Sequence, residues 1–201
     1  MRRSNPERSA ATRASLLDAA TELFARDGFT GTSTDQILAT TGMTRGALYH
    51  HFRDKTDLFA EVCEQLHAEA GGAIEDAVEK TIADRGSSLD VLRAGCEAWL
   101  DFVSRPGTYQ ILVVDAPSTL GWDRWQELDS RHGYATLIEG VRKAQVEELL
   151  TDRIPAARLA QFLNGAMNQA VLTIGTDPGS LADLLTDVNS LIDVLSTLPR
   201  K

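Results

Sequence analysis

The chain has 201 residues, of which 43% are hydrophobic and 24% are charged, and its formal net charge is −9. This composition is ordinary for a globular protein of one domain or two small ones, and the acidic balance argues against a generic nucleic-acid-binding protein. The start, "MRRSNPERSAATR", is basic and polar with no apolar stretch after it, unlike a secretory signal, and no apolar run approaches membrane-spanning length. We therefore expect a cytoplasmic protein.

The charge is distributed unevenly along the chain. Residues 1–55 hold 8 Lys and Arg against 6 Asp and Glu, a net charge of +2, whereas residues 56–201 carry −11. This asymmetry favours a protein with two parts, and we predict domains at 1–55 and 56–201. Cys63 and Cys96 have no metal-binding or redox spacing, so we expect them to be small core residues in a reducing compartment.

The first predicted helix covers residues 13–27, where apolar residues recur at helical spacing, and Gly28 suits its C-terminal cap. Ser33 and Gln36 then have the spacing of a capping box, which predicts a second, short helix that Gly42 ends.

A third helix is predicted over 45–51 with Thr44 as its cap, and a fourth over about 55–83 with Asp54 as its cap. Two short helices joined by a tight glycine turn make a helix-turn-helix. Gly71 and Gly72 lie inside the fourth helix. They either form a local kink or a close packing contact with a neighbouring helix, or they act as a hinge.

Beyond residue 86 the pattern remains helical. We predict one helix over the apolar stripe that ends before Pro106, and further helices over 107–115, 121–150, 156–174 and 180–197. The segment "TDPGS" interrupts the helical pattern before the last of these helices. The total is about nine helices and no convincing strand, which predicts an all-α fold. The last two helices have broad apolar faces, which either close the core or pack against their copies in a second subunit as a four-helix bundle.

The stretch "TTGMTRGALYHHFRDKTDLF" carries the groups that a helix in a DNA major groove needs. Arg45 can pair with a guanine edge, and Gly46 lets the backbone approach closely. Hydroxyl, imidazole and ammonium groups for phosphate contacts are supplied by Thr34, Thr44, Tyr49, His50, His51 and Lys55. Each of these residues alone is as compatible with a half-buried helix edge, but their combination on a helix-turn-helix favours DNA binding.

The segment "TRASLLDAATELFARDGFTGTSTDQILATTGMTRGALYHHFRDKTDLFAEV" resembles the N-terminal domain of TetR-type (tetracycline-repressor-like) transcription regulators. The resemblance implies a homodimer on a palindromic double-stranded DNA operator and a C-terminal helical domain that senses a small molecule. The DNA contacts it implies are Thr34, Thr44, Arg45, Gly46, Tyr49, His50, His51 and Lys55. It places Leu48 and Phe52 in the core of the small domain, while Ala47 departs from the pattern and offers no polar contact.

Aromatic residues of the C-terminal part are the candidates for an effector site, because an apolar pocket with a few convergent polar groups is the usual form of such a site. The predicted ligand-binding residues are Trp99, Phe102, Tyr109, Trp122, Trp125, Met167 and Asn168. Trp122, Trp125, Asp129 and His132 have the spacing of one helical face. The alternative is that these aromatic residues are core and that Asp129 and His132 lie on the surface.

We expect no enzyme, cofactor or metal site, since the four histidines lack metal-ligand spacing and no nucleotide-binding or nucleophile motif is present. The predicted function is a ligand-responsive repressor that dimerises through its last two helices and is released from its operator by an effector. The alternatives are an activator or effector-independent regulator of the same fold, or a ligand carrier or enzyme on this scaffold.

Overall fold

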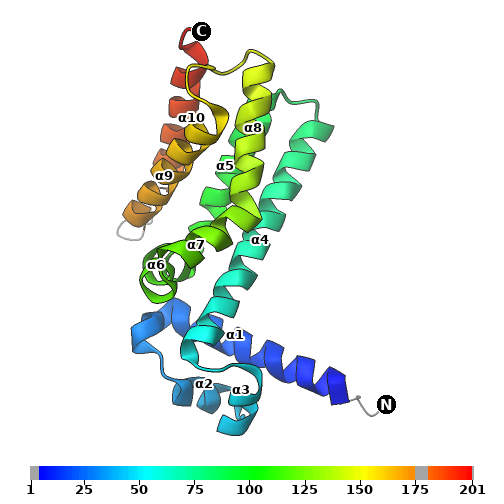
Figure 1. Cartoon of the computed structure of the whole chain (residues 1–201), viewed down its shortest axis with the longest axis vertical. Helices are drawn as coiled ribbons and strands as arrows, with labels where there is room; N and C mark the ends of the chain where they lie inside the picture. Colours follow the sequence, from blue (N-terminus) through cyan, green and yellow to red (C-terminus); the bar gives the residue numbers. More distant parts are fainter. Residues whose placement is uncertain (1–4, 175–180, 201) are drawn as a thin grey trace. The chain divides into compact units, whose positions relative to one another are not determined.

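The computed structural model describes residues 5–174 and 181–200 (Figure 1). Counted as uninterrupted helical runs, these residues form nine helices, and no strand occurs among them, so the all-α prediction is confirmed. The predicted break at 176–180 lies outside the described residues. Within the described ranges, no helix is both long and apolar enough to cross a membrane.

The chain divides into two compact units. The N-terminal unit comprises Met1–Leu66 and Pro106–Trp125, and the C-terminal unit comprises His67–Arg105 and Gln126–Lys201. The first boundary lies inside α4 (Lys55–Ala83), so this helix contributes residues to both units. A functional boundary at residue 55 stays a prediction.

The N-terminal unit is built around α1 (Asn5–Gly31), which begins eight residues earlier than the sequence pattern indicates. Pro6 in the first turn is compatible with this start, because its missing N–H group has no helical partner there. Gly28 interrupts the helix with φ 72°, as predicted for a capping glycine. Phe24, Phe29 and Phe59 then pack with ring centroids 5.0–5.9 Å apart and form the aromatic centre of the core.

The helix-turn-helix consists of α2 (Thr34–Thr41) and α3 (Arg45–His51), and its predicted caps are confirmed. Ser33 Oγ accepts from the N–H of Gln36 at 3.2 Å, and Gln36 Oε1 accepts from the N–H of Ser33 at 2.7 Å. Gly42 ends α2 in the left-handed region at φ 67°. The capping oxygen of Asp54 accepts from the N–H of Asp57 at 2.8 Å at the start of α4.

Replacing Ser33 with alanine is expected to lower the free energy of unfolding by about 1 kcal/mol, because the N–H of Gln36 then loses its acceptor and the capping box is broken. Urea unfolding followed by circular dichroism measures this loss. Ser118→Ala is the matched control, since Ser118 Oγ only donates back to the carbonyl of Asp115 within its own helix. An equal loss in both variants would contradict the capping role.

Residues 106–125 join the N-terminal unit, which the sequence pattern does not show. They form a π-helix, η1 (Gln110–Asp115), that continues into α6 (Ala116–Leu120) and packs against α1. Asp115 Oδ2 accepts from the N–H of Phe29 at 2.8 Å, and Gln110 Nε2 donates to the other oxygen of Asp115 at 3.0 Å. At Gly107 (φ 79°) a Cβ atom would lie 2.2 Å from the Cβ of Ala25, so only glycine allows this close approach.

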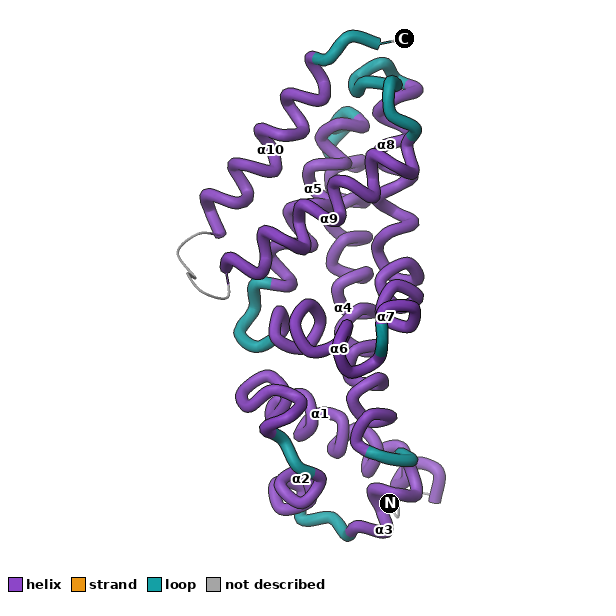
Figure 2. The backbone as a smooth tube through the Cα atoms, turned by 60° about the vertical axis from the view of Figure 1, so that its left-hand side comes forward, coloured by secondary structure: helices purple, strands orange, loops and turns teal. Residues whose placement is uncertain are grey.

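The C-terminal unit contains the rest of α4 and α5 (Ser88–Val103). The unit boundary after Trp125 lies inside α7 (Trp122–Asp129), and the rest of α7 continues through the π-helix η2 (Ser130–Tyr134) into α8 (Ala135–Val146) in the C-terminal unit. It ends with α9 (Ala156–Ile174) and α10 (Leu181–Thr197). In Figure 2, α8 lies beside α5 and α9, and these helices pack against one another. Arg93 of α5 contacts α10 by donating a hydrogen bond to the carbonyl of Asn189 at 3.1 Å and by forming an ion pair with Asp193.

The last two helices bury one apolar face and expose another. Leu163 on α9 and Ile192 on α10 are buried in the unit. Phe162 on α9 and Val194 on α10 are each 57% exposed, and Leu191, three residues before Val194, is exposed as well. The buried faces of α9 and α10 therefore close the core, which is the first of the two roles predicted for these helices. Their exposed faces, called the outer faces below, remain available to a partner.

Candidate functional site

One face of α3 presents polar groups to solvent. Thr44, Arg45, Gly46, Tyr49 and His50 are all exposed. The opposite face of the same segment carries Leu48 and Phe52, which are buried in the core of the N-terminal unit. The predicted division of this segment into a buried and an exposed side is therefore present in the structure.

Neither the space around Gly46 nor its backbone conformation requires glycine at this position. A Cβ atom at this position would meet only Thr44 Oγ1, at 3.9 Å, within 4 Å, and the backbone is helical. An exposed glycine inside a helix costs about 1 kcal/mol relative to alanine. Close approach of another molecule to the outer side of α3 would account for that cost.

Arg45 lies across from α2 and forms an ion pair with Asp35. Its side chain is 63% exposed, so the pair contributes little to stability and the guanidinium remains accessible. Thr44 Oγ1 caps the helix by accepting from the N–H of Ala47 at 3.3 Å, which leaves its hydroxyl proton available to an acceptor. Thr34 is half-buried at the start of α2.

The two histidines differ in environment, although their ring centroids are only 5.1 Å apart. Burial lowers the pKa of His51, and the nearby positive charges of His50 and Arg13 lower it further. The neutral form of His51 is therefore favoured, so it is suited to hydrogen bonding rather than to supplying charge.

Lys55 has an internal role that the sequence pattern does not reveal. Its Nζ donates to the carbonyls of Phe29 at 2.8 Å and Thr32 at 2.9 Å, and it lies 4.0 Å from the centroid of the Phe29 ring. A cation satisfying carbonyls at the end of α1 is favourable for the helix dipole. Contact of Lys55 with DNA stays a prediction, since this ammonium already uses two of its three donors.

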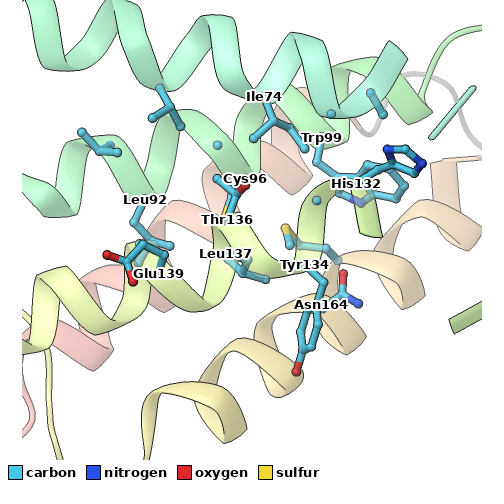
Figure 3. Close-up of a pocket in the computed structure, with 18 of the residues that line it drawn as sticks. Ile74, Leu92, Cys96, Trp99, His132, Tyr134, Thr136, Leu137, Glu139 and Asn164 are labelled. Atoms are coloured by element: carbon cyan, nitrogen blue, oxygen red, sulfur yellow. The ribbon is translucent and has the colours of Figure 1, made fainter. Parts of the chain in front are cut away.

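The C-terminal unit contains a cavity of about 120 Å³ between α4, α5, η2, α8 and α9 (Figure 3). Its walls are mainly apolar, with Ile74, Leu92, Cys96 and Leu137 among the lining side chains. Its polar and titratable lining residues are His67, Asp129, His132, Tyr134, Thr136, Glu139, Lys143 and Asn164.

Two of the predicted ligand-binding residues, Trp99 and Met167, line this cavity. Phe102 is buried, with the Arg105 guanidinium 4.4 Å from its ring centroid, and neither it nor Asn168 is among the lining residues. Tyr109 belongs to the N-terminal unit.

Trp122 and Trp125 also lie in the N-terminal unit, with ring centroids 4.9 Å apart. The indole N–H of Trp125 donates to the carbonyl of Leu112 at 2.8 Å, whereas Trp122 is exposed. Asp129 and His132, by contrast, line the cavity of the other unit. The four residues of the predicted helical face are thus divided between the two units, and a ligand contact by either tryptophan stays a prediction.

Hydrogen bonds hold the polar end of the cavity in place. Asn164 Nδ2 donates to Asp129 Oδ2 at 2.9 Å, and the hydroxyl of Tyr134 donates to the carbonyl of Ala157 at 3.2 Å. Burial raises the pKa of Asp129, and the hydrogen bond from Asn164 acts in the opposite direction. The rings of His67 and Trp99 stack with an interplanar angle of 11°.

Thiol and metal chemistry find no support in the described part of the chain. Burial raises the pKa of Cys96 to about 12 and raises that of Cys63 as well, so both thiols stay protonated and unreactive. Among residues 5–174 and 181–200, no group of three or more His, Cys, Asp or Glu side chains is arranged to hold a metal ion.

Known proteins resemble both parts of the chain. Residues 16–62 match the family of bacterial regulatory proteins called the tetR family, and residues 89–198 match the tetracyclin repressor-like C-terminal domain. The transcriptional regulator AcrR of Shigella flexneri is 39% identical over 93 residues, which are 46% of this chain and 42% of the relative. A transcriptional repressor of Streptomyces coelicolor is 27% identical over 167 residues, 81% of this chain and 79% of the relative.

The solved structure of a TetR-family transcriptional regulator from Pectobacterium atrosepticum has the same fold, with a TM-score of 0.75 and 28% identity. That similarity covers 98% of this chain and 100% of the other. The C-terminal family model alone covers more than half of the chain. The chain therefore belongs to the TetR family of transcriptional regulators.

Proposed function

We propose that the chain is a ligand-responsive repressor, which binds a palindromic operator as a homodimer and is released when a small effector enters the cavity of the C-terminal unit. The exposed polar face of α3 supports DNA binding most directly, because Gly46 has no internal reason to lack a side chain. Acting on DNA would place the protein in the cytoplasm.

The dimer is proposed to form through the outer faces of α9 and α10. These faces expose Phe162, Leu191 and Val194, and exposed large apolar side chains of this kind are typical of a surface that a partner covers. Two-fold symmetry would then place the two α3 helices in half-sites about 34 Å apart.

The cavity can influence DNA binding because the chain passes between the two units at three points, between residues 66 and 67, 105 and 106, and 125 and 126. Each point joins a segment of the C-terminal unit covalently to α4, η1 or α7. An effector that changes the preferred arrangement of these segments would shift operator affinity by a coupling free energy on the order of 1–3 kcal/mol.

The proposal is tested by selecting random duplex DNA on the purified protein at about 0.1 M salt and titrating the selected sequence with salt. A palindrome is the expected result, with an affinity that falls steeply with salt because α3 and the helix starts contact phosphates while the rest of the chain is acidic. Recovery of sequences without two-fold symmetry would exclude a symmetric dimer. No enrichment over random DNA, with or without small-molecule extracts, would contradict the repressor function.

A further inference from the structure

The two ends of the cavity differ in how their carboxylates are neutralised. Glu139 accepts from Arg142 Nε at 2.8 Å and from its terminal nitrogen at 2.7 Å, and Lys143 Nζ lies 3.9 Å away. At the other end Asp129 accepts a hydrogen bond from Asn164, and within the described residues it forms no ion pair. One acidic lining residue thus has two cationic neighbours and the other has none.

The uncompensated charge of Asp129 is costly where it lies. The side chain is half-buried, and a carboxylate that loses part of its hydration is destabilised unless a cation or several donors replace it. Burial accordingly raises the pKa of Asp129, although the Asn164 amide favours the ionised form. Lys143 does not serve as the counter-ion, since it follows 14 residues later on the α7–α8 run, roughly 20 Å along a helix axis, and faces Glu139.

A second group in the cavity lacks a partner. Trp99 is 8% exposed, and among the described residues its Nε1 has no hydrogen-bond acceptor. A buried donor without an acceptor costs about 1–3 kcal/mol, and the π face of an aromatic ring is a weak acceptor for such an N–H group, so a bound aromatic ring would be favourable there. Figure 3 shows Trp99 and His132 close together, with Asn164 and Tyr134 on neighbouring elements around the same space.

The remaining walls fix the size and character of the rest of the ligand. Ile74, Leu92, Leu137 and Met167 are apolar lining residues, and the space measures about 120 Å³. An engineered apolar cavity of about 150 Å³ holds benzene, so this space suits a body about the size of one ring.

We propose that the cavity binds a small organic amine, with its ammonium group beside Asp129 and a ring-sized apolar body among Ile74, Leu92 and Leu137. The ammonium supplies the positive charge that Asp129 lacks, whereas Lys143, the lysine that lines the cavity, already pairs with Glu139 and is less able to attract an anionic ligand. That this amine acts as an effector rests on the repressor function proposed above.

Three probes that share one ring and differ in charge test this ligand class on the full chain: 2-phenylethylamine, 2-phenylethanol and phenylacetate. Isothermal titration calorimetry at pH 7 is expected to show the amine binding at least about tenfold more tightly than the alcohol, with phenylacetate weakest. The Asp129→Asn variant should lose the preference for the amine over the alcohol. Asp101→Asn is the matched control, because Asp101 is exposed on α5 and does not line the cavity.

The wild-type comparison decides the matter even if Asp129→Asn fails to fold. Equal affinity for amine and alcohol, a preference for phenylacetate, or no binding of any probe would each overturn the proposal. Operator binding is measured in parallel on the selected palindrome. Amine binding without operator release would leave the ligand class intact and contradict the effector role, whereas operator binding without amine binding would contradict the ligand class alone.

Discussion

The double substitution Arg45→Ala, Tyr49→Ala is expected to weaken operator binding by about 100-fold or more at fixed salt. The two side chains leave α3 four residues apart and are both exposed, so they lie on the same face of the helix. A good side-chain contact to a base edge is worth about 1–3 kcal/mol, and two such losses of about 1.4 kcal/mol give this factor. Fluorescence anisotropy with the labelled palindrome measures it.

The fold and the proposed dimer should tolerate this change. The Arg45–Asp35 pair is exposed on both sides, so its loss has little effect on stability, and Leu48, the buried residue of α3, is retained. Size-exclusion chromatography with light scattering and the thermal unfolding midpoint are therefore expected to match the wild type.

Arg26→Ala separates a specific role of α3 from a general effect of positive charge. Arg26 resembles Arg45 closely, because its side chain is 68% exposed and pairs with a neighbouring carboxylate, Asp27, at 2.6 Å. It lies on α1 rather than on α3. Operator affinity should stay within about threefold of the wild type in this variant. An equal loss in Arg26→Ala, or full affinity in the double variant, would contradict the assignment of α3 to the major groove.

The helix-turn-helix was predictable because its determinants are local. Ser33 with Gln36, Gly42, Thr44 and Asp54 each act within four residues along the chain, and each cap follows from side-chain chemistry that the sequence displays. The start of α1 was less predictable, since residues 5–12 lack a strong apolar stripe and extend the helix without burying much of it.

The composition of the two units could not be predicted in the same way. The hydrogen bond from Phe29 to Asp115 joins residues 86 apart, and the Lys55 ammonium reaches back to the carbonyl of Phe29. Neither contact leaves a periodic signal, because it depends on how separate helices pack. The assignment of residues 106–125 to the N-terminal unit follows only from such contacts.

An apolar cavity with a few polar groups was predicted in the C-terminal part of the chain, but only some of its lining residues were predicted. Helical periodicity identifies Trp99 and Met167 as inward-facing, but it does not distinguish a core position from a cavity wall. In addition, a period of 3.6 residues describes an α-helix, whereas the π-helix Ser130–Tyr134 has more residues per turn and shifts the faces that follow it. The expectation that Trp122 and His132 share a helical face depends on the shorter period and stays a prediction.

Alanine at Gly71 and alanine at the adjacent Gly72 are expected to change stability in opposite directions. A Cβ atom at Gly71 would lie 2.5 Å from the backbone carbonyl oxygen of His132, which cannot rotate away, so α4 and η2 would have to separate. Overpacking of this kind costs about 1–3 kcal/mol. At Gly72 no atom lies within 4 Å of the new Cβ, and the better helix propensity of alanine should add about 0.5–1 kcal/mol.

The free energy of unfolding of the two variants, measured in urea, therefore distinguishes the interpretations of this glycine pair. The position of Gly71 supports the close-packing interpretation. This interpretation requires Gly71→Ala to be destabilised, while Gly72→Ala is stabilised and is still released from the operator by the effector. A hinge requires backbone freedom at both positions, so Gly72→Ala would then fold normally yet lose the response to the effector. Since both substitutions add the same methyl group to the same helix, any difference between them comes from the carbonyl of His132 and not from helix propensity.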